Sequence, residues 1–335
     1  MAKRVISLLF FTFLSVFANA QVNDWENLEI TQINAEKAHA SYIPFERLNW
    51  EDNVLNHSPL VQILNGNWKF LYFENPGLIP PNIHLETNTS DWDNIRVPGY
   101  WQLQGDGKYD PPKDYNPTGV YKKNFVIPTA WSHQQIFIHF AGVQSAMYLW
   151  VNGEIVGYHE DGMLPAEFNI TSYVRTGSNE MTVQVFNWSD GSYIEDQDFW
   201  RLSGIYRDVY LFTTPGIRMQ DFSLYPELDN NYRDAELHLE VNVKNMDRRS
   251  YGNLTIQATL KDPSGEMIST QKSEPFTVKG GTEESVKLMA TVSNPLKWTA
   301  ETPNLYRVGI ELQTANGETI QAFVVNTGFR KIEIR

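Results

Sequence analysis

Apolar and polar residues alternate along much of the chain with a period of two. The alternation is clearest in residues 136–140, 237–243, 254–260 and 308–312. Successive side chains of a β-strand point to opposite faces of the sheet, so each segment would place one apolar face against a core. The pattern therefore predicts half-buried strands. No window keeps the 3.6-residue period of an amphipathic helix for more than a turn or two.

Turn-forming residues separate the extended segments. Asn152-Gly153 and Asn316-Gly317 each stand between two extended runs, and Asp262–Gly265 is a third turn sequence. An Asn-Gly pair suits the two positive φ angles of a type I′ hairpin turn. Strands joined by such turns predict an all-β fold, most simply two β-sandwiches.

A domain boundary is expected near Thr213–Gly216, directly after an apolar strand. Residues 61–214 form an aromatic-rich segment of about 150 residues, the size of a jelly-roll sandwich. Residues 215–335, roughly 120 residues of regularly spaced strands and turns, have the size of an immunoglobulin-like sandwich. Residues 21–60 have no strong period and are interpreted as an extended N-terminal arm that lies on the body.

The first twenty residues have the pattern of a signal peptide. Lys3 and Arg4 precede the apolar run Val5–Phe17, and Ala18-Asn19-Ala20 supplies the small residues of a cleavage site before Gln21. A buried N-terminal helix is the alternative. The run is too short to span a bilayer as a helix, and no second long apolar segment follows. We therefore expect export to the periplasm or the medium, with no membrane attachment after cleavage.

Composition narrows the classes of partner. The chain has no cysteine, so disulfides and cysteine-ligated zinc are excluded. The formal net charge of −13 repels phosphate backbones and argues against nucleic acid as a partner. The chain also has 10 Trp, 16 Tyr and 18 Phe. Such rings can stack on sugars, but they suit an ordinary β-core equally well, so composition alone does not choose between the two.

The richest polar stretch is Trp188–Gly204. It places four acids among three large side chains, namely Asp190, Glu195, Asp196 and Asp198 among Tyr193, Trp200 and Arg201. Carboxylates beside rings can hold sugar hydroxyls or a hard cation. A polar loop between two strands is the alternative interpretation. Glycosidase catalysis by this group is disfavoured, because the acids are sequence neighbours and a catalytic pair must flank the scissile bond.

Other candidate sites are weaker. Asp106–Gly119 is a Pro-Gly-rich loop of the kind that rims binding clefts, although many such loops are only connections. The seven histidines are scattered, without a pair at metal-binding spacing. The chain also lacks a Gly-rich phosphate loop and a Gly-x-Ser-x-Gly elbow.

Ten strings of this chain carry a family resemblance. They are Asp24–Asn27, Leu64–Phe70, Val97–Gln102, Asn116–Tyr121, Asn152–Tyr158, Leu164–Phe168, Trp188–Asp208, Asn294–Trp298 with Pro303–Tyr306, and Gly328–Arg330. In this order they resemble the large bacterial β-galactosidases of glycoside hydrolase family 2. Trp188–Asp208 is the most specific string, and the resemblance covers essentially the whole mature chain.

The resemblance implies an arm, a jelly-roll sugar-binding domain and an immunoglobulin-like domain, followed by a (β/α)8 barrel. Both catalytic glutamates of the family lie on that barrel, which begins just after the segment matched by Gly328–Arg330. No catalytic residue is therefore expected in this chain, which ends at Arg335. The chain alone is expected to be inactive.

The resemblance also implies two substrate-binding positions. The last aspartate of the family's Glu-Asp-Gln-Asp motif, here Asp198, would bind galactose hydroxyls and a sodium ion. A family Asn-Pro-Pro string sends its asparagine to the same pocket, and Asp110 stands at that place here. Trp200 and Arg201 would support the loop. The intact enzyme would also need a divalent cation, magnesium or calcium, and the arm at Asp24 would help it to form a homo-oligomer.

The sequence thus favours the sugar-binding and immunoglobulin-like domains of a secreted β-galactosidase that hydrolyses terminal β-D-galactose residues with retention. A stand-alone carbohydrate-binding protein and a structural scaffold are the alternatives.

Overall fold

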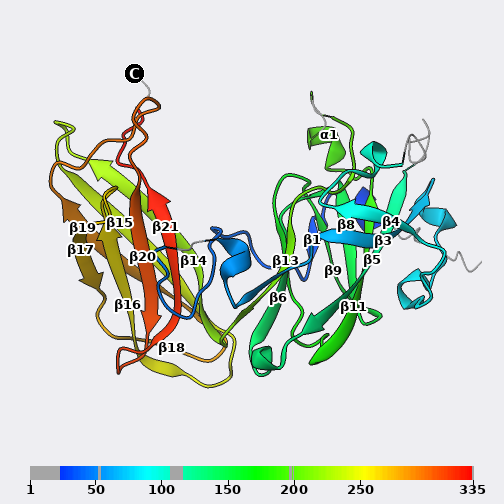
Figure 1. The fold of residues 1–335 in the computed structure, drawn as a ribbon, viewed down its shortest axis with the longest axis horizontal. Coiled ribbons are helices and arrows are strands. Elements are labelled where there is room, and N and C mark those ends of the chain that lie inside the picture. Colours follow the sequence, from blue (N-terminus) through cyan, green and yellow to red (C-terminus); the bar gives the residue numbers. More distant parts are fainter. Residues whose placement is uncertain (1–22, 52–53, 106–115, 196–197, 199, 334–335) are drawn as a thin grey trace, which may run out of the picture.

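The structure is a computed structural model that describes residues 23–51, 54–105, 116–195, 198 and 200–333. The proposed signal peptide lies outside the described residues. Two β-sandwiches stand side by side, and the extended N-terminal segment runs between them (Figure 1). The expected all-β fold with two sandwiches is confirmed. No helix in the described part of the chain is both long and apolar enough to cross a membrane.

The first sandwich packs a seven-stranded sheet against a four-stranded sheet. The strand orders are β1-β9-β8-β11-β5-β3-β4 and β10-β6-β13-β2, and β12 pairs with β7 beside them. The strands are β1 (Gln32–Ile33), β2 (Val61–Ile63), β3 (Gly66–Phe73), β4 (Asp93–Val97), β5 (Thr118–Ile127), β6 (Gln135–Phe140), β7 (Val143–Gln144), β8 (Ala146–Val151), β9 (Glu154–Glu160), β10 (Ala166–Asn169), β11 (Gly177–Phe186), β12 (Gly204–Ile205) and β13 (Val209–Thr214).

The helices of the described chain are short. They are the α-helix α1 (Ser192–Glu195) and the 3-10 turns Asp24–Glu26, Leu55–His57, Pro76–Leu78, Ile83–Leu85, Trp101–Leu103 and Thr129–Trp131.

The second sandwich has a three-stranded sheet, β14-β15-β19, facing a sheet of order β17-β16-β20-β21 in which β18 also pairs with β16. The strands are β14 (Ile217–Leu228), β15 (Ala235–Asn245), β16 (Tyr251–Lys261), β17 (Met267–Lys272), β18 (Phe276–Val278), β19 (Glu283–Val292), β20 (Tyr306–Gln313) and β21 (Thr319–Thr327). The first sandwich's last strand ends at Thr214 and the second's first strand begins at Ile217, so only Pro215-Gly216 joins them.

Strand β15 follows the alternating pattern that the sequence shows. Its apolar residues Leu237, Leu239, Val241 and Val243 are buried in the second core, while the residues between them are more exposed. Strand β6 departs from the pattern. Its apolar set Ile136, Ile138 and Phe140 is buried as expected, but Phe137 and His139 on the opposite face are buried too. The face that carries Phe137 and His139 packs against the junction between the two sandwiches, where Arg218 lies over the Phe137 ring.

The two Asn-Gly pairs form different turns. Asn152 and Gly153 have φ angles of 51° and 83°, as the predicted type I′ turn requires. At the second pair only Gly317 has a positive φ, 80°, and the turn closes with Gly317 N–H donating to Thr314 O at 2.9 Å. The I′ prediction is wrong there, because a longer connection between β20 and β21 lets a single left-handed residue complete the reversal.

The N-terminal segment binds both sandwiches. On the first, Trp25 stacks on Phe186 with ring centroids 4.2 Å apart, and β1 pairs with β9. On the second, Phe45 exchanges two backbone hydrogen bonds of 2.8 Å with Ala322. The arm therefore adds contacts across a connection that is covalently only two residues long.

Candidate functional site

The Asp198 loop, of which residues 188–195, 198 and 200–203 are described, lies at the end of the first sandwich where α1 projects (Figure 1). It connects the end of β11 to β12. Several of its apolar side chains are open to solvent: Tyr193 is 94% exposed, Ile194 74% and Trp200 77%. Exposed large apolar side chains are unusual enough that several on one loop make the loop a candidate binding face. Asp198 is exposed on the same loop.

The two ends of the loop meet in a buried polar group that we call the neck, formed by Gln102, Asn187 and Ser203. Gln102 Nε2 donates to Asn187 Oδ1 at 3.2 Å, and its Oε1 accepts the Ser203 N–H at 2.9 Å. The Ser203 hydroxyl also donates to Asn187 Oδ1. Asn187 and Ser203 are 5% and 1% exposed, so water cannot replace these bonds cheaply.

A second set of hydrogen bonds, between the Asn116 side chain and the Trp188 backbone, holds the first residue of the loop. We call it the Asn116 clamp. Asn116 Nδ2 donates to the Trp188 carbonyl, and Asn116 Oδ1 accepts the Trp188 N–H, both at 2.9 Å. The side-chain amide thereby takes the place of a strand neighbour. It continues the β5–β11 ladder beyond the Thr118–Phe186 pair and the bond from Asn187 N–H to Pro117 O.

The acids of the loop do not act as one group. Glu195 Oε1 accepts the Gly162 N–H at 2.9 Å, and burial raises the pKa of Glu195. Asp190 lies inward beside Glu160. Burial, reinforced by Asp190, raises the pKa of Glu160 to about 7, although a hydrogen bond from the Tyr158 hydroxyl opposes the shift. Asp190 and Glu195 thus face the protein, whereas Asp198 faces outward.

Asp198 makes no hydrogen bond or ion pair with the rest of the described chain. Asp110 and Asp196 lie outside the described residues, so whether Asp110 and Asp198 share a pocket stays a prediction. Arg201 supports the loop, with its guanidinium 5.6 Å from the centre of the Trp188 ring. Most of the Trp200 surface is exposed, and the expectation that Trp200 supports the loop stays a prediction.

The described residues do not form a metal site around Asp198. Nowhere in them do three His, Asp or Glu side chains gather at metal-binding distances. Asp198 offers a single carboxylate, whereas a hard cation needs several oxygen ligands. The sodium ion and the divalent cation of the intact enzyme stay predictions.

A hollow of about 430 Å³ lies elsewhere, between the arm and the second sandwich. Its lining includes Tyr42, Phe222, Leu224 and Val325 but no charged side chain. The hollow thus offers no charged group to a sugar, whereas the Asp198 loop carries one exposed carboxylate and two exposed aromatic rings.

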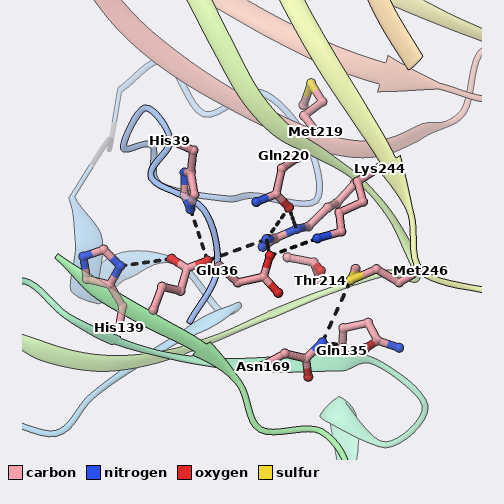
Figure 2. Close-up of polar contacts among 12 residues, drawn as sticks. Glu36, His39, Gln135, His139, Asn169, Thr214, Met219, Gln220, Lys244 and Met246 are labelled. Carbon is pink, nitrogen blue, oxygen red and sulfur yellow. Dashed lines mark hydrogen bonds and ion pairs between the residues drawn. The ribbon is translucent and has the colours of Figure 1, made fainter. Parts of the chain in front are cut away.

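A charged group that the sequence patterns do not predict, the junction cluster, is buried between the arm and the two sandwiches. It consists of Glu36, His39, His139, Glu167, Arg218, Gln220 and Lys244, and Figure 2 shows the arm residues Glu36 and His39 reaching into it. Glu167 lies at its centre. His39 Nε2 and His139 Nδ1 contact its carboxylate oxygens at 3.2 and 3.0 Å, and Arg218 approaches to 3.6 Å.

The charges of the junction cluster balance one another. Burial alone would raise the pKa of Glu167, but hydrogen bonds from His139 and His39 and the charge of Arg218 hold it far below its usual range. Burial lowers the pKa of His39, but Glu167 outweighs that effect and raises it. Arg218 is fully buried over the Phe137 ring at 4.0 Å. A charged residue between apolar neighbours, as in Ala166-Glu167-Phe168, was the available signal.

Family models match both sandwiches. Residues 61–215 match the model described as "Glycosyl hydrolases family 2, sugar binding domain", and residues 217–330 match the model described as "Glycosyl hydrolases family 2". The chain belongs to glycoside hydrolase family 2. The resemblance found in the sequence is confirmed at the level of both domains.

Curated relatives in this family are named β-galactosidase. The protein of Priestia megaterium (strain DSM 319 / IMG 1521) is 39% identical over 93% of this chain and 32% of its own length. That of Psychromonas ingrahamii (strain DSM 17664 / CCUG 51855 / 37) is 37% identical over 94% of this chain and 32% of its own length. The chain thus spans about a third of the length of the curated relatives it matches.

Solved structures agree with the fold. Bacteroides uniformis β-glucuronidase 2 superposes with a TM-score of 0.71 at 26% identity, covering 81% of this chain and 32% of that one. Bifidobacterium dentium β-glucuronidase gives a TM-score of 0.69 at 20% identity, covering 82% and 49% of the two chains. The second likeness supports the fold alone.

Proposed function

We propose that this chain forms the sugar-binding and immunoglobulin-like domains of an exported β-galactosidase that hydrolyses terminal β-D-galactose residues with retention. A catalytic barrel carrying both glutamates would belong to the same polypeptide, and this chain would be inactive without it. The arm would contribute to a homo-oligomer of the complete enzyme. The galactoside assignment is supported by relatives named β-galactosidase at 37–39% identity, against 26% for the β-glucuronidase.

The observation that carries the proposal is the outward-facing Asp198. Within one short loop, Asp190 and Glu195 turn toward the protein, while Asp198 has no partner among the described residues. The same loop carries the exposed rings of Tyr193 and Trp200. An anionic acceptor can receive hydrogen bonds from sugar hydroxyls, and charge-assisted bonds are the strong ones. Asp198 would therefore bind galactose hydroxyls, and Trp200 and Tyr193 would exclude water around them.

The placement of the loop supports completion by a further domain. In Figure 1, α1 and the last described residues of the second sandwich lie on the same side of the molecule. A barrel that follows residue 335 would start on that side. It could cover the exposed rings and close a galactose subsite against Asp198.

The native protein in its source cells provides the test. An antibody against this chain should detect an extracytoplasmic species about three times the 38.6 kDa of this chain, because the chain covers 32% of its relatives. That species should begin at Gln21 and cleave 2-nitrophenyl β-D-galactoside much faster than the matching glucuronide. A stable product of this chain's own size without hydrolytic activity would contradict the proposal.

A stand-alone carbohydrate-binding protein is the second candidate, favoured by the exposed Tyr193 and Trp200 beside Asp198. The two candidates differ in what the isolated chain binds. Titration calorimetry with galactose at millimolar concentration should give no binding heat if the subsite needs a barrel. A saturable heat that disappears in the Asp198→Ala variant would favour the binding protein.

A further inference from the structure

We propose that Asn116 and Gln102 are positioning residues that hold the Asp198 loop in the orientation that presents Asp198 to the sugar. The inference rests on the proposed function, in which Asp198 belongs to the galactose subsite. Neither residue lies in the loop. Each acts through hydrogen bonds to the loop's ends, at Trp188 and at Ser203 with Asn187.

The Asn116 clamp determines where the rigid sheet stops and the loop begins. Ladder pairing of β11 with β5 ends at Phe186, and Asn187 N–H still bonds to Pro117 O. The Asn116 amide adds one more donor–acceptor pair, so the Trp188 backbone is held as firmly as a strand residue. The asparagine amide carries its donor and its acceptor on separate atoms, so it can bond the carbonyl and the N–H of Trp188 at the same time.

Gln102 closes the other end of the loop. It binds Ser203 through its oxygen and Asn187 through its nitrogen, so one side chain spans both ends of the loop. The Trp101 N–H also donates to Ser203 O at 3.1 Å, which adds a backbone bond to the same closure. A loop whose ends are tied at a buried point loses most of its freedom to swing as a body.

If Asn116 and Gln102 had only a structural role, replacing them would lower the stability of the first sandwich without changing sugar binding. The loop has further anchors, because Glu195 binds Gly162 on the connection between β9 and β10 and Arg201 lies over the Trp188 ring. Losing one end should therefore rotate or shift the loop rather than unfold it. A ligand group must be held within about half an ångström to bind well, so such a shift weakens sugar binding through Asp198.

The test is a double-mutant cycle in the complete polypeptide that contains this chain, with 2-nitrophenyl β-D-galactoside as substrate. Asn116→Ala should raise KM about tenfold, and kcat should change less than about twofold. In an Asp198→Ala background, Asn116→Ala should add less than about a twofold change, because the residue it positions is gone. Gln102→Met, which keeps the length and loses both polar ends, should behave in the same way.

Asn179→Ala is the matched control. Asn179 clamps the turn at the opposite end of β11, donating to Arg175 O at 2.7 Å and accepting the Arg175 N–H at 2.9 Å. Asn179 is buried and Asn116 is half-buried, so the control removes at least as many bonds, at the end of β11 that lies away from the Asp198 loop. KM of this variant should remain at the wild-type value in both backgrounds.

Hydrogen exchange supplies a readout that does not depend on activity. In Asn116→Ala the Trp188 amide should exchange at least about tenfold faster while the core strands of the first sandwich keep their protection. Faster Trp188 exchange with unchanged KM would overturn the positioning role, and so would equal KM increases in both Asp198 backgrounds. An Asp198→Ala enzyme with wild-type KM would instead overturn the proposed function itself.

Discussion

The junction cluster and the Asp198 loop place charged and apolar side chains in opposite ways. At the junction, Glu167 and Arg218 are buried and surrounded by partners. In the loop, Trp200 and Tyr193 are exposed, and Asp198 has no partner in the described chain. Paired charges in a dry interface fix one arrangement of the segments they join. Exposed rings and an unpaired carboxylate instead leave groups available for recognition, as the proposed binding role of the loop requires.

The comparison predicts that the largest loss of stability comes from removing the central carboxylate of the junction cluster. Glu167→Ala should lower the free energy of unfolding by about 3–5 kcal/mol, because it leaves Arg218 buried without its central counter-charge. Urea unfolding of the chain measures the loss.

Trp200→Ala is the control, since it truncates a large side chain that is mostly exposed. It should leave the unfolding midpoint of the chain almost unchanged. Equal losses of stability in the two variants would remove the distinction between the regions.

Changing the pH should alter the stability of the junction by less than the Glu167→Ala substitution does. The pKa of Glu167 is held below its ordinary value of 4.5, so its contribution is present above that value and disappears as the pH falls through the folded-state pKa. The pKa of His39 is raised above 6.5, so its contribution is present below 6.5 and disappears as the pH rises through the folded-state pKa. The junction should therefore be most stable between about pH 4.5 and 6.5.

Thermal unfolding from pH 4 to 9 tests this window when wild type is compared with His39→Gln. The side chain of glutamine can still donate to Glu167 but does not titrate. The stability advantage of the wild type should shrink as the pH rises above about 6.5, because Glu167 raises the pKa of His39. A difference that stays constant with pH would show that His39 contributes no titrating charge to the junction.

The sequence predicts features that depend on local rules. The alternation in β15 and the Asn152-Gly153 turn depend on side-chain period and on the backbone preferences of two residues, and both are found in the structure. The burial of Phe137 and His139 depends on what covers the outer face of β6. The periodicity of one strand does not show which other segments pack on its outer face.

The site was only partly predictable for the same reason. Asp198 was recognised from a family resemblance, and its neighbours Asp190 and Glu195 were grouped with it because they are close in sequence. The structure separates them, since hydrogen bonds and burial turn two of the acids inward. The members of the junction cluster come from residues 36 to 244, and only the packing of the arm and two sandwiches brings them together.

The role of Asp198 is the central claim, and steady-state kinetics of the complete polypeptide tests it most directly. Asp198→Ala should raise KM for 2-nitrophenyl β-D-galactoside about 10- to 100-fold, equivalent to about 1.5–3 kcal/mol for hydrogen bonds to a charged group. The melting temperature should stay at the wild-type value. Glu301→Ala, which removes an exposed acid of the second sandwich, is the control and should behave as wild type. Unchanged KM in Asp198→Ala would contradict the account.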